Sequence, residues 1–192
     1  MSKNPSMKLE LKKFDPSKIN DDSVIVAIAA RNRGKSVCLR DILSNHCSIP
    51  IGMVISPTEH ANAFFQNFIP KILIHDEYSP ELIEKYVQRQ QKISAKFKKE
   101  KKDFGYSSID PRSFLVMDDA MYDKSWVTDT NIRKIFMNGR HYKIMFIITM
   151  QYALGVPPNL RTNIDYVFIL RETYVSNRKR LYEHYAGMFP SF

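Results

Sequence analysis

The sequence predicts a three-layer α/β domain with a central, mainly parallel β-sheet. From Val24 onward, short apolar segments alternate with amphipathic segments, as in domains where helices cover both faces of a sheet. Most of the apolar segments are continuously hydrophobic and rich in Ile and Val, which is typical of parallel strands buried on both faces. With 192 residues, of which 44% are hydrophobic, the chain is large enough to bury the core of one such domain.

Six apolar segments are expected to form the strands. They are residues 24–29, 51–55, 72–75, 114–117, 144–149 and 166–170. Five amphipathic segments, residues 35–45, roughly 58–68, 79–102, 131–138 and 176–186, are expected to form helices. Two of these helices carry end signals: Ser79 and Pro80 suit an N-cap and the first helical position, and Gly139 stands where a C-cap glycine belongs.

Composition limits the possible environments and partners. The longest apolar runs, 24–30 and 144–150, are far shorter than the roughly 20 residues that span a bilayer, so no membrane span is expected and the protein is interpreted as soluble and intracellular. The two cysteines, Cys38 and Cys47, do not have the spacing of a metal site, and a disulfide scaffold or structural zinc is not expected.

The basic charge of the chain favours a polyanionic partner. The formal net charge is +9, and clustered Lys and Arg side chains gain affinity for phosphates by releasing counterions. The densest group comprises Lys92, Lys96, Lys98, Lys99, Lys101 and Lys102, relieved only by Glu100. A solvated helix face and a nucleic-acid contact both account for this group, and the sequence does not separate them.

A phosphate-binding loop is expected directly after the first strand. Gly34, Lys35 and Ser36 match the end of the GxxxxGK[ST] signature, in which Lys meets the β- and γ-phosphates of ATP and the hydroxyl helps to hold Mg²⁺ at a helix N-terminus. The expected nucleotide-contacting residues are Ala29, Ala30, Arg31, Asn32, Arg33, Gly34, Lys35, Ser36 and Val37.

This loop departs from the full signature at two positions. Ala29 stands where the first glycine is expected, and its Cβ would disfavour a left-handed backbone by roughly 1 kcal/mol. Arg33 occupies a position usually held by a small residue, and Arg31 and Arg33 are either extra phosphate contacts or solvated charges. Both departures bear on the geometry of the loop and on its affinity for nucleotide.

A pair of carboxylates ends the fourth apolar segment. Asp118 is the expected Mg²⁺ ligand, directly or through water, and Asp119 is the expected general base or water-positioning residue for attack on the γ-phosphate. Gln151 follows the next strand, where ligands gather in open α/β sheets, and is a candidate polar sensor. Each of these residues has a plainer interpretation as a solvated turn or surface side chain.

Further segments complete a family pattern. They are residues 56–59 (SPTE), 74–78 (IHDEY), 138–142 (NGRHY), 149–151 (TMQ) and 160–166 (LRTNIDY). In order and spacing, over about residues 24–171, the chain resembles the genome-packaging ATPases of nucleocytoplasmic large DNA viruses, in the FtsK–HerA branch of P-loop NTPases. The acidic pair is Asp-Asp, where many relatives in the wider branch have Asp-Glu.

The resemblance implies a RecA-like fold with an additional strand between the P-loop strand and the acidic strand. It also implies a ring, pentameric or hexameric, with ATP at subunit interfaces, and translocation of double-stranded DNA into a capsid with capsid or portal components as partners. Arg140 matches a candidate arginine finger, and Arg161 is a second candidate. A finger supplies positive charge to the transition state and can reach in from a neighbouring subunit. A DNA-facing or salt-bridged Arg140 is the alternative.

The domain division follows from these motifs. Residues 1–23 are expected to form an N-terminal lead-in and residues 24–192 a P-loop ATPase domain, possibly a fragment of a longer protein. The expected location is the virion or a cytoplasmic viral assembly site. The rival functions are another FtsK–HerA-type DNA pump or helicase, a nucleotide or nucleoside kinase, and a basic DNA-binding module with a degenerate P-loop.

Overall fold

The computed structural model describes residues 12–119, 123–189 and 192. Within them a six-stranded, all-parallel sheet has the order β3-β2-β4-β5-β1-β6. The strands are β1 (Val24–Ile28), β2 (Gly52–Ile55), β3 (Ile74–His75), β4 (Ser113–Met117), β5 (Ile144–Met150) and β6 (Tyr166–Ile169). The predicted α/β class and parallel sheet are confirmed, and so is the additional strand: β5 separates the P-loop strand β1 from the acidic strand β4.

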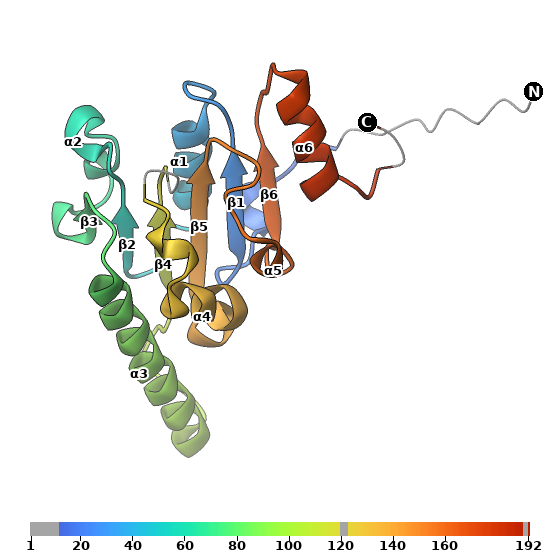
Figure 1. The fold of residues 1–192 in the computed structure, drawn as a ribbon. Coiled ribbons are helices and arrows are strands. Elements are labelled where there is room, and N and C mark those ends of the chain that lie inside the picture. Colours follow the sequence, from blue (N-terminus) through green and yellow to red (C-terminus); the bar gives the residue numbers. More distant parts are fainter. Residues whose placement is uncertain (1–11, 120–122, 190–191) are drawn as a thin grey trace, which may run out of the picture.

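Helices cover both faces of this sheet (Figure 1). They are α1 (Lys35–Asn45), α2 (Glu59–Asn62), α3 (Pro80–Phe104), α4 (Thr130–Asn138), α5 (Pro158–Arg161) and α6 (Val175–Tyr185), with 3₁₀ turns η1 (Pro16–Lys18), η2 (Phe65–Asn67), η3 (Lys71–Leu73), η4 (Ser125–Val127) and η5 (Gly139–Tyr142). On one face, α1 packs Leu39 and Ile42 against strand residues such as Ile25. On the other face, α3, α4, α5 and α6 pack against residues such as Phe146. Alternate residues of each strand thus enter two separate cores.

The predicted helix over residues 58–68 is wrong. Only α2 is α-helical there, because Ala63 adopts a left-handed conformation with φ 50° and ends the helix. The buried carboxylate of Glu59 then accepts hydrogen bonds from the backbone amides of Phe65 (3.0 Å) and Gln66 (2.9 Å). These bonds stabilise the 3₁₀ turn η2 in place of a longer helix.

The end signals of two other helices had different outcomes. Ser79 caps α3 as predicted, accepting a hydrogen bond from the amide of Leu82 at 3.4 Å, with Pro80 in the first turn. Gly139 is not a left-handed C-cap: its φ is −52° and the chain continues into η5. Lys143, with φ 57°, makes the left-handed turn into β5. The short helix α5 was not expected from the sequence.

The described part of the lead-in packs on the rest of the domain. Ile19 is 3% exposed, and the Phe14 ring lies 5.5 Å from the ring of Phe168. Asp21 holds the buried His46 at 2.7 Å and Arg112 at 2.6 Å. Across the described ranges, none of the helices has the length and apolar character needed to cross a bilayer.

Candidate functional site

The loop between β1 and α1 has the backbone geometry of an anion-binding nest. Gly34, the N-cap of α1, has φ 87°, and Asn32 has φ 58°. Alternation of right- and left-handed residues turns successive backbone N–H groups into one concavity, and the first amides of α1 add to it. Asn and Gly are the residues that tolerate left-handed φ best. This loop can therefore surround a phosphate group.

The expected strain at Ala29 is absent. Ala29 is not among the described residues with positive φ, so its Cβ carries no left-handed penalty. It is 3% exposed and extends β1, donating its backbone amide to the carbonyl of Met150 at 3.1 Å. The missing first glycine therefore leaves the loop geometry intact. Arg31 and Arg33 are both exposed at the loop surface.

Lys35 lies half-buried at the start of α1. Its ammonium donates a hydrogen bond to the carbonyl of Ala29 at 3.2 Å. Burial lowers the pKa of Lys35, whereas the carboxylates of Asp119 and Asp118 oppose this shift. The charge of Lys35 and the two carboxylates therefore attract one another at the carboxyl-terminal edge of the sheet.

Asp118 is a buried carboxylate held by two hydroxyl groups. It is 7% exposed and accepts hydrogen bonds from Thr149 Oγ1 at 2.7 Å and Ser56 Oγ at 3.2 Å. Burial raises the pKa of Asp118, and the neighbouring Asp119 carboxylate raises it further. The two hydroxyl bonds and the Lys35 charge lower it and favour the ionised form.

The position of Asp119 is fixed by its own backbone conformation and by hydrogen bonds with Thr149 in β5 and Gln151, which directly follows β5. It adopts a left-handed conformation with φ 52°, which is uncommon for a residue other than glycine. Its amide donates to Thr149 Oγ1 at 2.8 Å. Gln151 Nε2 lies 2.9 and 3.0 Å from the two oxygens of the Asp119 carboxylate. Gln151 therefore positions Asp119 in this structure.

Thr149 and Ser56 are functional candidates that the sequence analysis did not assign. Both are fully buried, at 0% exposure; Thr149 is the last but one residue of β5, and Ser56 directly follows β2. Thr149 joins the two acids, because its hydroxyl donates to Asp118 and accepts from the amide of Asp119. Two signals in the sequence pointed to Thr149 and Ser56: each is a hydroxyl residue at the end of an apolar strand, and each lies in a segment of the family pattern, 56–59 or 149–151.

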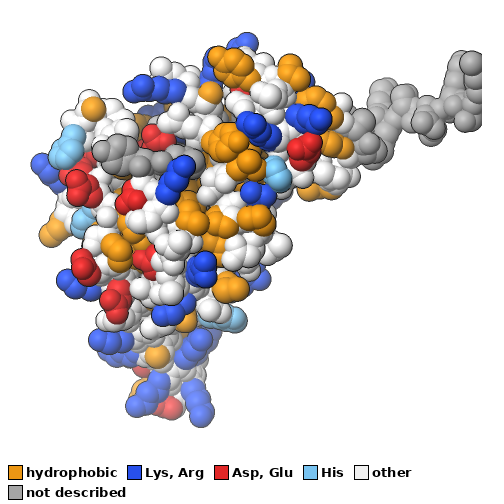
Figure 2. Space-filling model, in the orientation of Figure 1, with side chains coloured by type: hydrophobic (Ala, Val, Ile, Leu, Met, Phe, Trp, Pro, Cys, Tyr) orange, Lys and Arg blue, Asp and Glu red, His pale blue; other side chains and the backbone are white. Residues whose placement is uncertain are grey.

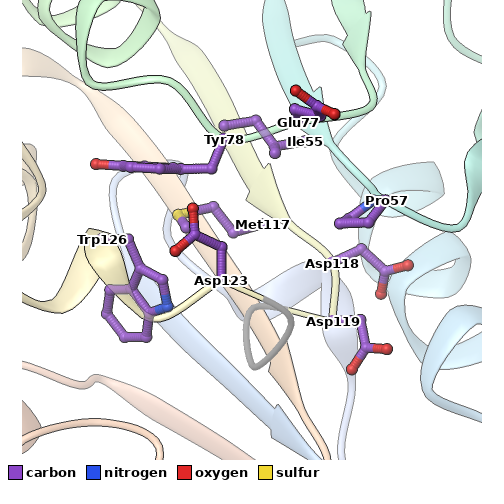
Figure 3. A pocket seen from close by; sticks show the side chains of 9 residues that line it. All are labelled: Ile55, Pro57, Glu77, Tyr78, Met117, Asp118, Asp119, Asp123 and Trp126. Carbon is purple, nitrogen blue, oxygen red and sulfur yellow. The ribbon is translucent and has the colours of Figure 1, made fainter.

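A cavity of about 130 Å³ adjoins the acidic pair, and Figure 3 shows the side chains that line it. Ile55, Met117 and Trp126 are among its apolar lining residues, and four acidic side chains, Glu77, Asp118, Asp119 and Asp123, also line it. None of the nine predicted nucleotide-contacting residues lines it. The cavity and the phosphate loop are therefore separate features that share the end of β4.

The two candidate arginine fingers lie away from this site within the chain. Arg140 is in η5, before β5, and pairs with Asp165 at 3.0 Å; its side chain is 68% exposed. Asp165 also accepts a hydrogen bond from the amide of Val24, the first residue of β1. Arg140 therefore sits at the amino-terminal edge of the sheet, opposite the phosphate loop. Arg161 is held between the carbonyl of Val156 at 2.8 Å and His184 at 3.0 Å.

This sheet, loop and acidic strand end define a P-loop NTPase fold, which solved structures share. The genome-packaging NTPase B204 of Sulfolobus turreted icosahedral virus 2, in complex with ATP-gammaS, matches with a TM-score of 0.60 and 15% identity, over 88% of this chain and 85% of that one. The cytoplasmic domain of EssC matches with a TM-score of 0.62 and 16% identity, over 83% of this chain and 35% of that one. The expected likeness to genome-packaging ATPases is confirmed at the level of fold.

Relatives in large DNA viruses are far more similar in sequence, although no protein-family model matches the chain. The uncharacterized protein L437 of Acanthamoeba polyphaga mimivirus is 43% identical over 185 residues, which are 96% of this chain and 64% of that protein. The uncharacterized protein 075L of Invertebrate iridescent virus 6 is 38% identical over 192 aligned residues, covering 95% of this chain and 70% of that protein. The chain belongs to this family of mimivirus and iridovirus proteins, and it spans about two thirds of the length of these two members.

The buried charge of Asp118 predicts a measurable effect on stability. Because the pKa of Asp118 is raised in the folded state, the folded protein binds this proton more tightly than the unfolded chain. The associated stability is present at low pH and is lost as pH rises through the folded-state pKa. Asp118→Asn, which removes the charge, should therefore raise the free energy of unfolding, and with it the urea midpoint, at pH 7 without nucleotide.

The difference between this variant and the wild type should shrink as the pH is lowered towards about 4. Asp41→Asn is the matched control, because Asp41 is an exposed carboxylate on α1 and its replacement should leave the midpoint close to wild type. A lower midpoint for Asp118→Asn at pH 7 would contradict the inferred cost of burying this charge.

Proposed function

We propose that this chain is the Mg-ATP-hydrolysing domain of a motor that moves double-stranded viral DNA into a capsid. The observation that carries the proposal is the meeting of three groups at one sheet edge. The nest after β1 offers amides to phosphate, Lys35 offers a positive charge, and the Thr149 hydroxyl holds both members of the acidic pair. This set matches what phosphoryl transfer to water needs, which is charge stabilisation and positioning.

Each residue has a distinct proposed role. Lys35 neutralises the β- and γ-phosphates. Asp119, aligned by Gln151, accepts a proton from the attacking water or orients it. Thr149 is a positioning residue that acts through the two acids.

The residues at this edge fit a magnesium ion. Ser36, at the first turn of α1, and Asp118 provide hard oxygen donors, which Mg²⁺ prefers. The hydroxyl bonds that Asp118 accepts favour its ionised form, as a metal ligand requires. When bound, Mg²⁺ would neutralise charge on the phosphate oxygens.

The motor function rests on the fold and the family. The proteins of similar fold include a viral genome-packaging NTPase solved with ATP-gammaS, and the relatives with similar sequences come from large DNA viruses. A motor of this kind would act as a ring of copies, with double-stranded DNA and capsid or portal components as partners, in the virion or at the assembly site. The net charge of this chain, +9, suits a polyanionic substrate.

Replacement of Lys35 by Ala is expected to reduce phosphate release from ATP by at least about 100-fold, because the phosphates lose their main positive contact. The measurement is release of inorganic phosphate with and without DNA. Lys134→Ala, an exposed lysine on α4, should leave turnover unchanged. Wild-type turnover in Lys35→Ala would exclude the proposed site, and phosphorylation of nucleosides without DNA would favour a kinase.

Thr149→Val is expected to lower kcat by about 10–100-fold with a small change in KM, because the acids lose alignment while the phosphate loop is untouched. Thr149→Ser keeps the hydroxyl and should restore most of the turnover. Equal loss in the Val and Ser variants would show that packing, rather than the hydroxyl, matters at this position.

Arg140→Ala is expected to abolish turnover while ATP still binds, if Arg140 completes the site of a neighbouring copy. Mixing it with Lys35→Ala should restore part of the activity, since each variant supplies the group that the other lacks. Asp165→Asn is the control, because it breaks the same ion pair but keeps the arginine. No recovery on mixing, with the two mixed variants folded, would count against action between copies.

A further inference from the structure

Helix α3 carries a linear stripe of basic side chains that the nucleotide site does not use. The stripe consists of Lys85, Arg89, Lys92, Lys96 and Lys99. Successive members are four, three, four and three residues apart, an average of 3.5, so they follow one face of the helix. From Lys85 to Lys99 the helix rises about 21 Å.

This face points away from the sheet. The buried residues of α3 are Ile83, Tyr86, Val87, Gln90 and Ser94, which lie on the other side of the helix. The Gln90 amide anchors that side by donating to the carbonyls of Pro111 at 2.9 Å and Tyr142 at 3.0 Å. All five stripe side chains are exposed. The anchored helix therefore holds the stripe as a rigid, solvent-facing row.

Basic residues outnumber acidic residues on this helix. Over Pro80–Phe104 the sequence has eight basic and four acidic residues, and only one of the acidic residues, Glu100, lies between Lys85 and Lys102. Within the described parts of the chain, α3 has one ion pair, Lys96 with Glu100, at a long 4.0 Å. Figure 2 shows Lys and Arg side chains gathered at the lower end of the molecule, where α3 extends past the sheet. Such a row repels itself, and a polyanion relieves the repulsion.

We propose that the stripe of α3 binds the phosphate backbone of double-stranded DNA without reading its sequence, an inference that rests on the proposed motor function. A row about 21 Å long spans roughly six base pairs at 3.4 Å each, so it can meet several phosphates of one duplex. Four of its five members are lysines, which act as point charges on phosphates and provide little base recognition.

The composition of the stripe disfavours other polyanions. Between Lys85 and Lys99 no large hydrophobic side chain is exposed among the described residues. Membrane-surface helices insert such side chains, and protein interfaces centre on buried aromatic or aliphatic anchors. A helix face that offers only charge suits a partner that is uniformly charged along its length.

The test compares two triple variants of the same helix. Lys92→Gln, Lys96→Gln and Lys99→Gln together remove three charges from the stripe. Lys98→Gln, Lys101→Gln and Lys102→Gln together remove three charges from the other faces of the end of α3. Both variants change the net charge equally, and circular dichroism and urea unfolding would confirm that each is folded. The comparison therefore isolates the position of the charges from their number.

Binding to a mixed-sequence duplex of about 30 base pairs is measured over a salt series without nucleotide. The stripe variant should reduce the slope of log K against log salt by about 3, because each lost phosphate contact is worth about 0.9, and should bind at least about tenfold more weakly near 0.1 M salt. The control variant should lose less than half as much slope. Poly-glutamate and vesicles containing phosphatidylserine are tested in parallel.

An unchanged slope in the stripe variant, or equal losses in the two variants, would overturn the proposal. Stripe-dependent binding to poly-glutamate or vesicles that is tighter than binding to DNA would also overturn it. Phosphate release from ATP without DNA tests the proposed function separately from the DNA-binding proposal. The stripe variant should release phosphate at the wild-type basal rate. If the wild-type protein binds DNA through the stripe but does not hydrolyse ATP, the DNA-binding proposal stands and the proposed ATPase function is excluded.

Discussion

Strand β5 runs through the middle of the sheet, bonded to β1 on one side and to β4 on the other, and all seven of its residues are buried. Because neighbouring strands lie about 4.8 Å apart, this strand separates β1 from β4 by about 10 Å at their carboxyl ends. Lys35 follows β1, Asp118 follows β4, and Thr149 lies between them near the end of β5. The inserted strand thus sets the width of the space in which a phosphate can meet both the lysine and the acids.

At the carboxyl-terminal edge of the sheet, burial and electrostatic attraction have opposite effects on the charges of Asp118 and Lys35. Burial pushes Asp118 and Lys35 towards their neutral forms, while their mutual attraction favours the charged ones. The left-handed backbone of Asp119 adds local strain. Perturbed charges and strained backbone concentrate where a protein binds or transforms a ligand. The rest of the fold, with two apolar cores, provides the stability that lets one edge remain unfavourable.

The sequence predicted what depends on local pattern. Continuous apolar runs identified the inner strands β1, β2, β4 and β5, because these are buried on both faces. The edge strands β3 and β6 are only partly buried, and residues 72–73 of the predicted third strand belong to η3. Ala63 and Lys143, which take left-handed conformations, were missed because nothing in their residue type requires them. Thr149 was not assigned to the site from the sequence. The role of its hydroxyl depends on its contacts with Asp118 and Asp119, which only the folded structure shows. Arg140 precedes β5 whereas the phosphate loop follows β1, so in a parallel sheet the two lie at opposite edges; the predicted parallel strands already implied this separation.

Helix α3 begins two residues after Glu77 and Tyr78 reach the cavity beside the acidic pair, and it runs past the opposite edge of the sheet (Figure 1). Its 25 residues make a rod about 37 Å long, fixed to the domain at Gln90. The far end of α3 is therefore held at a fixed distance from the acidic pair. Any partner bound there is kept that far from the edge of the sheet that carries the phosphate loop.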